Sequence, residues 1–170
     1  MTFDLQRAVQ IAFLERKAIL EASKDEQALQ KGISITVISG LIVGALKAFQ
    51  GESAFTLILS PIGALIGVIL LGAPVHWLAK LFGGKAAFGQ IIRPLFYTSI
   101  ISWLVPLQLL PLVGKIIAFV LSIWMLSSFA RVAKEVHEIS LVKAAVCVII
   151  PIVIFALIAL IYEIVAPTLY

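Results

Sequence analysis

Long apolar runs separated by short charged clusters are the dominant pattern in this chain. No charged residue interrupts the stretches 32–46, 53–79, 94–114, 116–130 and 144–162. About 20 apolar residues in a helix cross the ~30 Å hydrocarbon core of a bilayer. A spanning segment must satisfy its own backbone hydrogen bonds, and runs without alternating polar positions do so as helices rather than barrel strands. The pattern therefore predicts an all-α, polytopic transmembrane helical bundle.

Five spans fit the apolar runs, within a membrane domain of residues 31–170. We place them at about 33–49, 55–81, 91–108, 112–132 and 141–163. The third and fourth spans are the least regular pair, because Pro106, Pro111 and Gly114 interrupt the run and proline ends or kinks a helix. We expect a tight turn near 106–114 between two short spans, with a re-entrant hairpin as the alternative.

The composition agrees with a membrane domain. The chain is 62% hydrophobic and 13% charged, whereas soluble domains are about 25% charged. Its net charge of +4 does not indicate nucleic-acid binding, because the basic residues form no patch with aromatic stacking platforms. Cys147 is the only cysteine and cannot form an internal disulfide.

The basic residues predict the orientation, because Lys and Arg accumulate on the cytoplasmic side of membrane proteins. With five spans, the N-terminal segment, the 80–93 loop and the 131–143 loop share one side. They hold five, three and three basic residues, which is 11 of the 13 in the chain. The other side holds Lys47 and Lys115. We therefore expect a cytoplasmic N-terminus and a C-terminus outside.

Residues 1–30 form a separate cytoplasmic segment in this prediction, with an amphipathic helix over 2–22. Its apolar face would consist of Leu5, Val9, Ala12, Phe13, Ile19 and Leu20. Ile11 and Leu14 interrupt that pattern. The helix either packs under the bundle or serves as a membrane-surface or partner-docking helix.

The sequence Ser23-Lys24-Asp25-Glu26 fits a capping box. It predicts that a new helix begins there and runs into the first span.

Paired small residues predict close packing of the first two spans. Gly40 and Gly44 stand four apart in the first span, and Gly63 and Gly67 do so in the second. This spacing lets two helix backbones approach closely in lipid. We expect the spans to cross at these glycines.

Candidate chemistry is sparse, and we predict no catalytic residue, cofactor site or metal site. No acidic residue lies in the middle of a span, which counts against ion-coupled transport. His76 is expected at the membrane interface and His137 in a solvated loop. The hydroxyl groups of the spans are expected to bond to backbone or neighbouring helices.

A family resemblance rests on the loop after the second span. The sequence Gly83-Gly84-Lys85-Ala86-Ala87-Phe88-Gly89-Gln90, followed by Tyr97 and Pro106, resembles the GGxxxFxQ…Y…P stretch of the Ypt-interacting-protein (YIP) family. The segments 110–114 and 135–144 are similar to later parts of the same family.

The resemblance implies a five-span domain with a cytoplasmic N-terminus. Eukaryotic members are linked to prenylated GTPases and vesicle traffic, and they carry an Asp-Leu-Tyr-Gly-Pro motif that this chain lacks. The chain looks more like the short prokaryotic members, which implies a prokaryotic plasma membrane.

These observations favour a non-enzymatic protein that organises membrane or binds a partner through its cytoplasmic face. The alternative is a small transporter or lipid-handling protein. Expected partners are membrane lipids, a cytoplasmic protein and a second copy of the chain. The candidate contact residues are Lys80, Lys85, Arg93, Arg131, Lys134 and His137. For Lys80, Lys85 and Arg93, a topology anchor without ligand contact is the competing interpretation.

Overall fold

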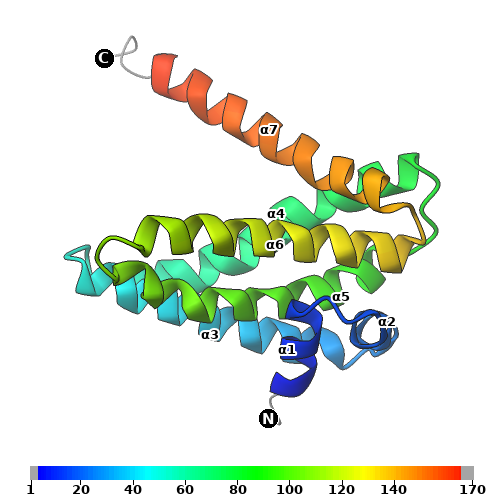
Figure 1. The fold of residues 1–170 in the computed structure, drawn as a ribbon, viewed down its shortest axis with the longest axis horizontal. Coiled ribbons are helices and arrows are strands. Elements are labelled where there is room, and N and C mark those ends of the chain that lie inside the picture. Colours follow the sequence, from blue (N-terminus) through cyan, green and yellow to red (C-terminus); the bar gives the residue numbers. More distant parts are fainter. Residues whose placement is uncertain (1–3, 166–170) are drawn as a thin grey trace.

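Helices account for all the regular structure in the computed structural model, which describes residues 4–165. Four of them are long and apolar enough to cross a membrane: α3 (Ala28–Phe49), α4 (Thr56–Leu81), α6 (Gly114–His137) and α7 (Leu141–Val165). Within residues 4–165 there is no strand. The prediction of an all-helical membrane protein is confirmed, and these four helices match four of the predicted spans closely (Figure 1).

The remaining predicted span is a helix of two kinds. α5 (Phe88–Thr98) continues without a break into η1 (Ser99–Leu109), a 3₁₀ helix that contains Pro106. Runs of 3₁₀ helix longer than three or four residues are uncommon. Together α5 and η1 pack against α3 and α6. At 1.5 Å per α-helical residue and 2.0 Å per 3₁₀ residue, they extend for about 38 Å.

Hydroxyl groups of α3 fasten that helix to the junction of α5 and η1. Thr36 Oγ1 lies 2.9 Å from the carbonyl oxygen of Phe96 and 3.0 Å from Ser99 Oγ. Ser39 Oγ lies 2.8 Å from the carbonyl oxygen of Ser99 and accepts a 3.0 Å hydrogen bond from Trp103 Nε1. The prediction that span hydroxyls bond to backbone and neighbouring helices is confirmed here. Such contacts join helices in lipid, where no hydrophobic effect does so.

The glycines of the first predicted pair, and not those of the second, make the close contact between α3 and α4. A β-carbon on Gly40 would overlap Pro61, and one on Gly44 would lie 2.7 Å from the carbonyl oxygen of Thr56. By contrast, a β-carbon on Gly63 or Gly67 would meet nothing within 4 Å. The crossing therefore brings Gly40 and Gly44 against the first turns of α4, and Gly63 and Gly67 face away from α3.

The N-terminal segment forms two short helices, so the single helix expected over 2–22 is wrong. α1 (Leu5–Ala12) and α2 (Arg16–Lys24) are separated by a turn in which Leu14 has φ of 64°. Both helices pack against α5 and α6 at one end of the bundle (Figure 1). Ile11, which interrupted the predicted apolar face, is fully buried against the bundle.

The predicted capping box at residues 23–26 is also wrong. Ser23 Oγ donates backwards to the carbonyl oxygen of Leu20 at 2.8 Å and caps no helix. Instead, Asp25 Oδ1 accepts a 2.9 Å hydrogen bond from the backbone N–H of Gln27, just before α3 begins. An aspartate that bonds the backbone two residues on is a common turn device.

α7 diverges from the other long helices toward its C-terminal end (Figure 1). Its first half contacts α4 and α6 and buries Ala144, Cys147 and Val148. From Val153 to Val165 every residue is exposed. Because all of these residues except Glu163 are apolar or aromatic, this half of α7 suits a lipid environment, with Glu163 near its outer end.

The α3–α4 contact predicts different effects for two glycine substitutions. Gly40→Ala should destabilise the protein by about 1–3 kcal/mol, because the new methyl group meets the α4 backbone. Gly67→Ala, in open space on α4, is the matched control and should be neutral or slightly stabilising. Thermal unfolding in detergent measures both. Equal effects of the two substitutions would contradict the packing described here.

Candidate functional site at the charged end of the bundle

The candidate residues lie at the end of the bundle where α4 meets α5 and α6 meets α7. We call this region the charged end. The structure separates them into two surface clusters, one arginine at the α2–α5 contact, and one buried histidine. The solvated 131–143 loop of the sequence prediction is mostly helix, since α6 extends to His137 and α7 begins at Leu141.

Three exposed lysines surround the α4–α5 loop and form the first cluster, which we call the lysine loop. Lys80 Nζ donates to the carbonyl oxygen of Lys85 at 3.5 Å, and Lys143 Nζ donates to that of Phe82 at 3.3 Å. Lys85 Nζ lies 3.3 Å from Glu138 Oε2. This ion pair is solvent-exposed and so contributes at most about 1 kcal/mol. The lysines therefore keep donors available for an anionic ligand.

A glycine turn positions the lysine loop. Gly83 has φ of 90°, in the region that favours glycine, and the chain reverses there after α4. Lys143 belongs to the loop but was not singled out from the sequence, because it is 58 residues from Lys85 and only the fold brings it near.

Glu135 joins three basic side chains in the second cluster. Its carboxylate lies 2.9 Å from Arg16 Nε, 3.1 Å from Arg131 Nη1 and 3.3 Å from Lys134 Nζ. The Glu135 side chain is only 7% exposed, whereas that of Arg16 is 70% exposed. One buried negative charge thus holds three cations, and the cluster carries surplus positive charge. It also ties α2 to α6.

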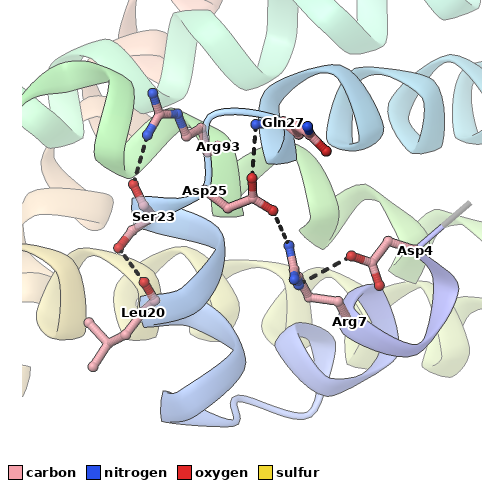
Figure 2. Close-up of polar contacts among 7 residues, drawn as sticks. All are labelled: Asp4, Arg7, Leu20, Ser23, Asp25, Gln27 and Arg93. Carbon is pink, nitrogen blue, oxygen red and sulfur yellow. Dashed lines mark hydrogen bonds and ion pairs between the residues drawn. The ribbon is translucent and has the colours of Figure 1, made fainter. Parts of the chain in front are cut away.

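Arg93 belongs to a polar joint between α5 and the N-terminal helices (Figure 2). Its Nη1 donates to the carbonyl oxygen of Ser23 at 3.0 Å. Nearby, Arg7 donates to Asp25 Oδ2 at 2.8 Å and lies 3.2 Å from Asp4 Oδ2 (Figure 2). Arg93 therefore helps to fasten α2 and is not part of the lysine loop.

The Arg7–Asp25 contact makes the N-terminal helices sensitive to acid. The hydrogen bond from Arg7 holds the pKa of the Asp25 carboxyl below its ordinary value of 3.8. A carboxyl group whose pKa is lowered by folding stabilises the folded protein at pH values above the ordinary pKa of that group. That contribution is lost as the pH falls through the lowered value.

His137 is buried and forms a pair with His76. The two imidazoles approach at 3.2 Å, from His76 Nδ1 to His137 Nε2. His137 is fully buried and His76 is 8% exposed. The expectation of a solvated His137 is wrong, because the fold covers it with α4 and the α4–α5 loop. A β-carbon on Gly84 would lie only 2.6 Å from His137 Nδ1.

The surroundings select one hydrogen-bonded form of the histidine pair. His137 Nδ1 is buried and has no hydrogen-bond partner within the part of the chain that the structure describes. A buried N–H without an acceptor is more costly than a bare nitrogen, so the proton of a neutral His137 belongs on Nε2. His137 Nε2–H then donates to His76 Nδ1, and Phe88 packs on the His76 ring with centroids 5.5 Å apart. The pair therefore joins α4, α5 and α6.

No metal site accompanies the histidines. Among residues 4–165, no group of three or more His, Cys, Asp and Glu side chains could hold a metal ion. The pair is best described as a packing and hydrogen-bonding contact beneath the lysine loop.

A cleft of about 360 Å³ lies away from the charged end, between η1, α6 and α7. Its lining is mainly apolar and includes Ile101, Leu121 and Ile152, with Ser102, Gln108 and Ser122 as the polar members. None of the described residues that line the cleft is ionisable.

Comparison with protein families gives one match that covers most of the chain. Residues 23–162 match the Yip1 domain. The chain belongs to the Yip1 domain family. No curated protein and no solved structure matches it.

Several residues that carried the sequence resemblance have structural roles in this Yip1 domain. Gly84 lies against His137, as described above. The Gln90 side chain accepts a 2.8 Å hydrogen bond from the backbone N–H of Ala87 where α5 begins. Tyr97 is fully buried, and its ring would lie 3.2 Å from a β-carbon on Gly32. These residues shape the α4–α5 loop and the contact between α5 and α3.

The Glu135 cluster generates a stability prediction for this Yip1 domain. Glu135→Gln should lower the free energy of unfolding by about 1–3 kcal/mol, because hydrogen bonds to a charged group are lost around a buried side chain. Glu138→Gln removes one exposed ion pair and should change stability by less than about 1 kcal/mol. Thermal unfolding of both variants in one detergent makes the comparison. A Glu135→Gln protein as stable as the Glu138→Gln protein would show that the cluster does not hold α2 to α6.

Proposed function

We propose that this Yip1 domain protein is a non-enzymatic membrane protein that binds anionic lipid headgroups at its charged end, and so organises the membrane around it. The observation that carries the proposal is the lysine loop. Lys80, Lys85 and Lys143 are exposed and converge on one loop, and among residues 4–165 their partners are backbone carbonyl groups and one exposed carboxylate. Phosphate oxygens of a lipid can replace these acceptors.

In this proposal the chain crosses the membrane five times, and the number of crossings determines which loops share a side. The length of α5 and η1 together supports a fifth crossing, because about 38 Å exceeds the ~30 Å hydrocarbon core. The bias of basic residues then puts the N-terminus and the charged end in the cytoplasm, with the C-terminus outside. The membrane would be a prokaryotic plasma membrane, whose inner leaflet supplies anionic lipids for the lysine loop.

The surplus positive charge of the Glu135 cluster supports the same surface. Arg16 is mostly exposed and lies on α2, on the same end of the bundle as the lysine loop. Each basic side chain near an anionic leaflet contributes about 1 kcal/mol, and salt weakens that contribution. Arg131 and Lys134 would add to this attraction even while they are paired with Glu135, because three cations share one carboxylate.

Transport is the second candidate function, and the structure supports it less. Coupled transporters place polar or ionisable groups near the middle of the membrane. The cleft between η1, α6 and α7 has no ionisable lining residue among those described. Its apolar lining suits an acyl chain, which keeps a lipid-handling role as the alternative.

Neutralising the lysine loop tests the proposed function. The triple variant Lys80→Gln, Lys85→Gln, Lys143→Gln should retain less phosphatidylglycerol from mixed phosphatidylglycerol–phosphatidylcholine micelles. We expect about a fivefold loss for each lysine that contacts a headgroup, and a smaller difference at high salt. The measurement is quantification of the lipids that co-purify with the protein.

The control for this experiment uses the basic residues at the opposite end of the bundle. Lys47→Gln with Lys115→Gln should leave phosphatidylglycerol retention unchanged. Undiminished retention in the triple variant, or an equal loss in the control, would refute the lysine loop as the lipid site. Binding of an acidic protein that the triple variant loses, without any loss of lipid, would reassign the surface to a protein partner.

A further inference from the structure

α1 has two neighbouring apolar stripes, and the fold buries only one of them. The inner face, Ala8, Ile11 and Ala12, is buried against the bundle. The outer face carries Leu5, Val9 and Phe13, which are 41%, 43% and 66% exposed. These three residues are spaced four apart and so form one stripe along the helix.

The C-terminal end of α1 lies beside the uncharged part of a membrane helix. Trp124 Nε1 of α6 donates to the carbonyl oxygen of Ala12 at 2.7 Å, and the rings of Phe13 and Trp124 have centroids 5.5 Å apart. Trp124 precedes Arg131, the first charged residue toward the charged end, by about 10 Å at 1.5 Å per residue. Between residues 116 and 130, α6 carries no charge. Phe13 therefore lies beside the uncharged part of α6, and not beside its charged end.

The next turn returns the chain to the charged end. Arg16, three residues after Phe13, pairs with Glu135 at 2.9 Å. Glu135 lies about 16 Å along α6 from Trp124. Between α1 and α2 the chain therefore runs from the side of the bundle to its charged end. On α2, the side chain of Lys17 is 88% exposed.

The only cation in α1 does not oppose insertion beside the bundle. Arg7 has both Asp4 and Asp25 within 3.2 Å, so its charge is paired on the inner side of the helix (Figure 2). Paired charges at the membrane boundary are tolerated where isolated ones are costly.

We propose that α1 is embedded in the leaflet at the charged end, where Leu5, Val9 and Phe13 contact lipid acyl chains while Ala8, Ile11 and Ala12 pack on the bundle. α1 then extends the lipid-facing surface of α6 sideways, next to the headgroup layer. This contact is with acyl chains and does not depend on the lysine loop or on lipid charge. It also explains why Ile11 interrupted the predicted apolar face, since the buried stripe and the lipid-facing stripe of α1 lie side by side.

Fluorescence quenching of the full chain in nanodiscs tests the position of α1. In a Cys147→Ser background, single cysteines at Val9→Cys or Phe13→Cys carry a bimane label, with Lys17→Cys as the matched control on α2. Phosphatidylcholine with brominated acyl chains should quench the labels at 9 and 13 at least twofold, with little effect at 17. Aqueous iodide should quench the label at 17 and spare those at 9 and 13. Neither result should change with salt or with phosphatidylglycerol content.

Two outcomes would overturn the proposal. Iodide quenching at 9 and 13 as strong as at 17 would place the stripe in water. Protection of both labels from iodide and from brominated lipid would mean that protein covers the stripe, either a second copy of the chain or another protein. Two labelled positions are used because one substitution could disturb the contact with Trp124, and elution as a monodisperse species qualifies each variant.

Discussion

The bilayer interior offers no water to a polar group, and this constraint organises the whole bundle. Each backbone and hydroxyl group at membrane depth must find a partner inside the protein. The contact between α3 and the α5–η1 junction meets this requirement, because Thr36 and Ser39 reach the carbonyl oxygens of Phe96 and Ser99 where the helix changes type. Gly40 and Gly44, one and two turns beyond Thr36, then let α4 approach α3 closely. These contacts and the buried apolar core together position the spans.

At the charged end, ionic contacts add to this packing. Glu135 gathers cations from α2 and α6, and the His76–His137 pair joins α4 to α6 beneath the α4–α5 loop. Glu135 and His137 are buried and contact side chains of other helices, so they serve the fold. The lysines around the loop are exposed and only weakly held. We infer that two groups of residues at this end have different roles. The ionic contacts of buried Glu135 stabilise the Yip1 domain, and the exposed lysines are available to bind anionic headgroups.

Much of the fold was predictable, because charge and apolar length determine where helices enter and leave a membrane. α3, α4, α6 and α7 begin or end close to the residues expected. The 3₁₀ helix η1 was not predictable, since its stability depends on donors from α3 that lie about 60 residues away. The role of Glu135 was not predictable for the same reason, because its partner Arg16 is distant in sequence. Lys80 and Lys85 were found because they are neighbours in the chain, whereas the burial of His137 required the loop to fold over it.

The central claim is that α5 and η1 together cross the membrane, so that the charged end and the η1–α6 turn lie on opposite sides. Leu112 in that turn is fully exposed, and Lys85 is exposed in the lysine loop. In a Cys147→Ser background, Lys85→Cys and Leu112→Cys can be labelled in intact cells with a thiol reagent that does not cross membranes. The account predicts that residue 112 reacts from outside and that residue 85 reacts only after the cells are opened. Labelling of both residues from the same side would mean that α5 and η1 do not cross the membrane and would contradict the account.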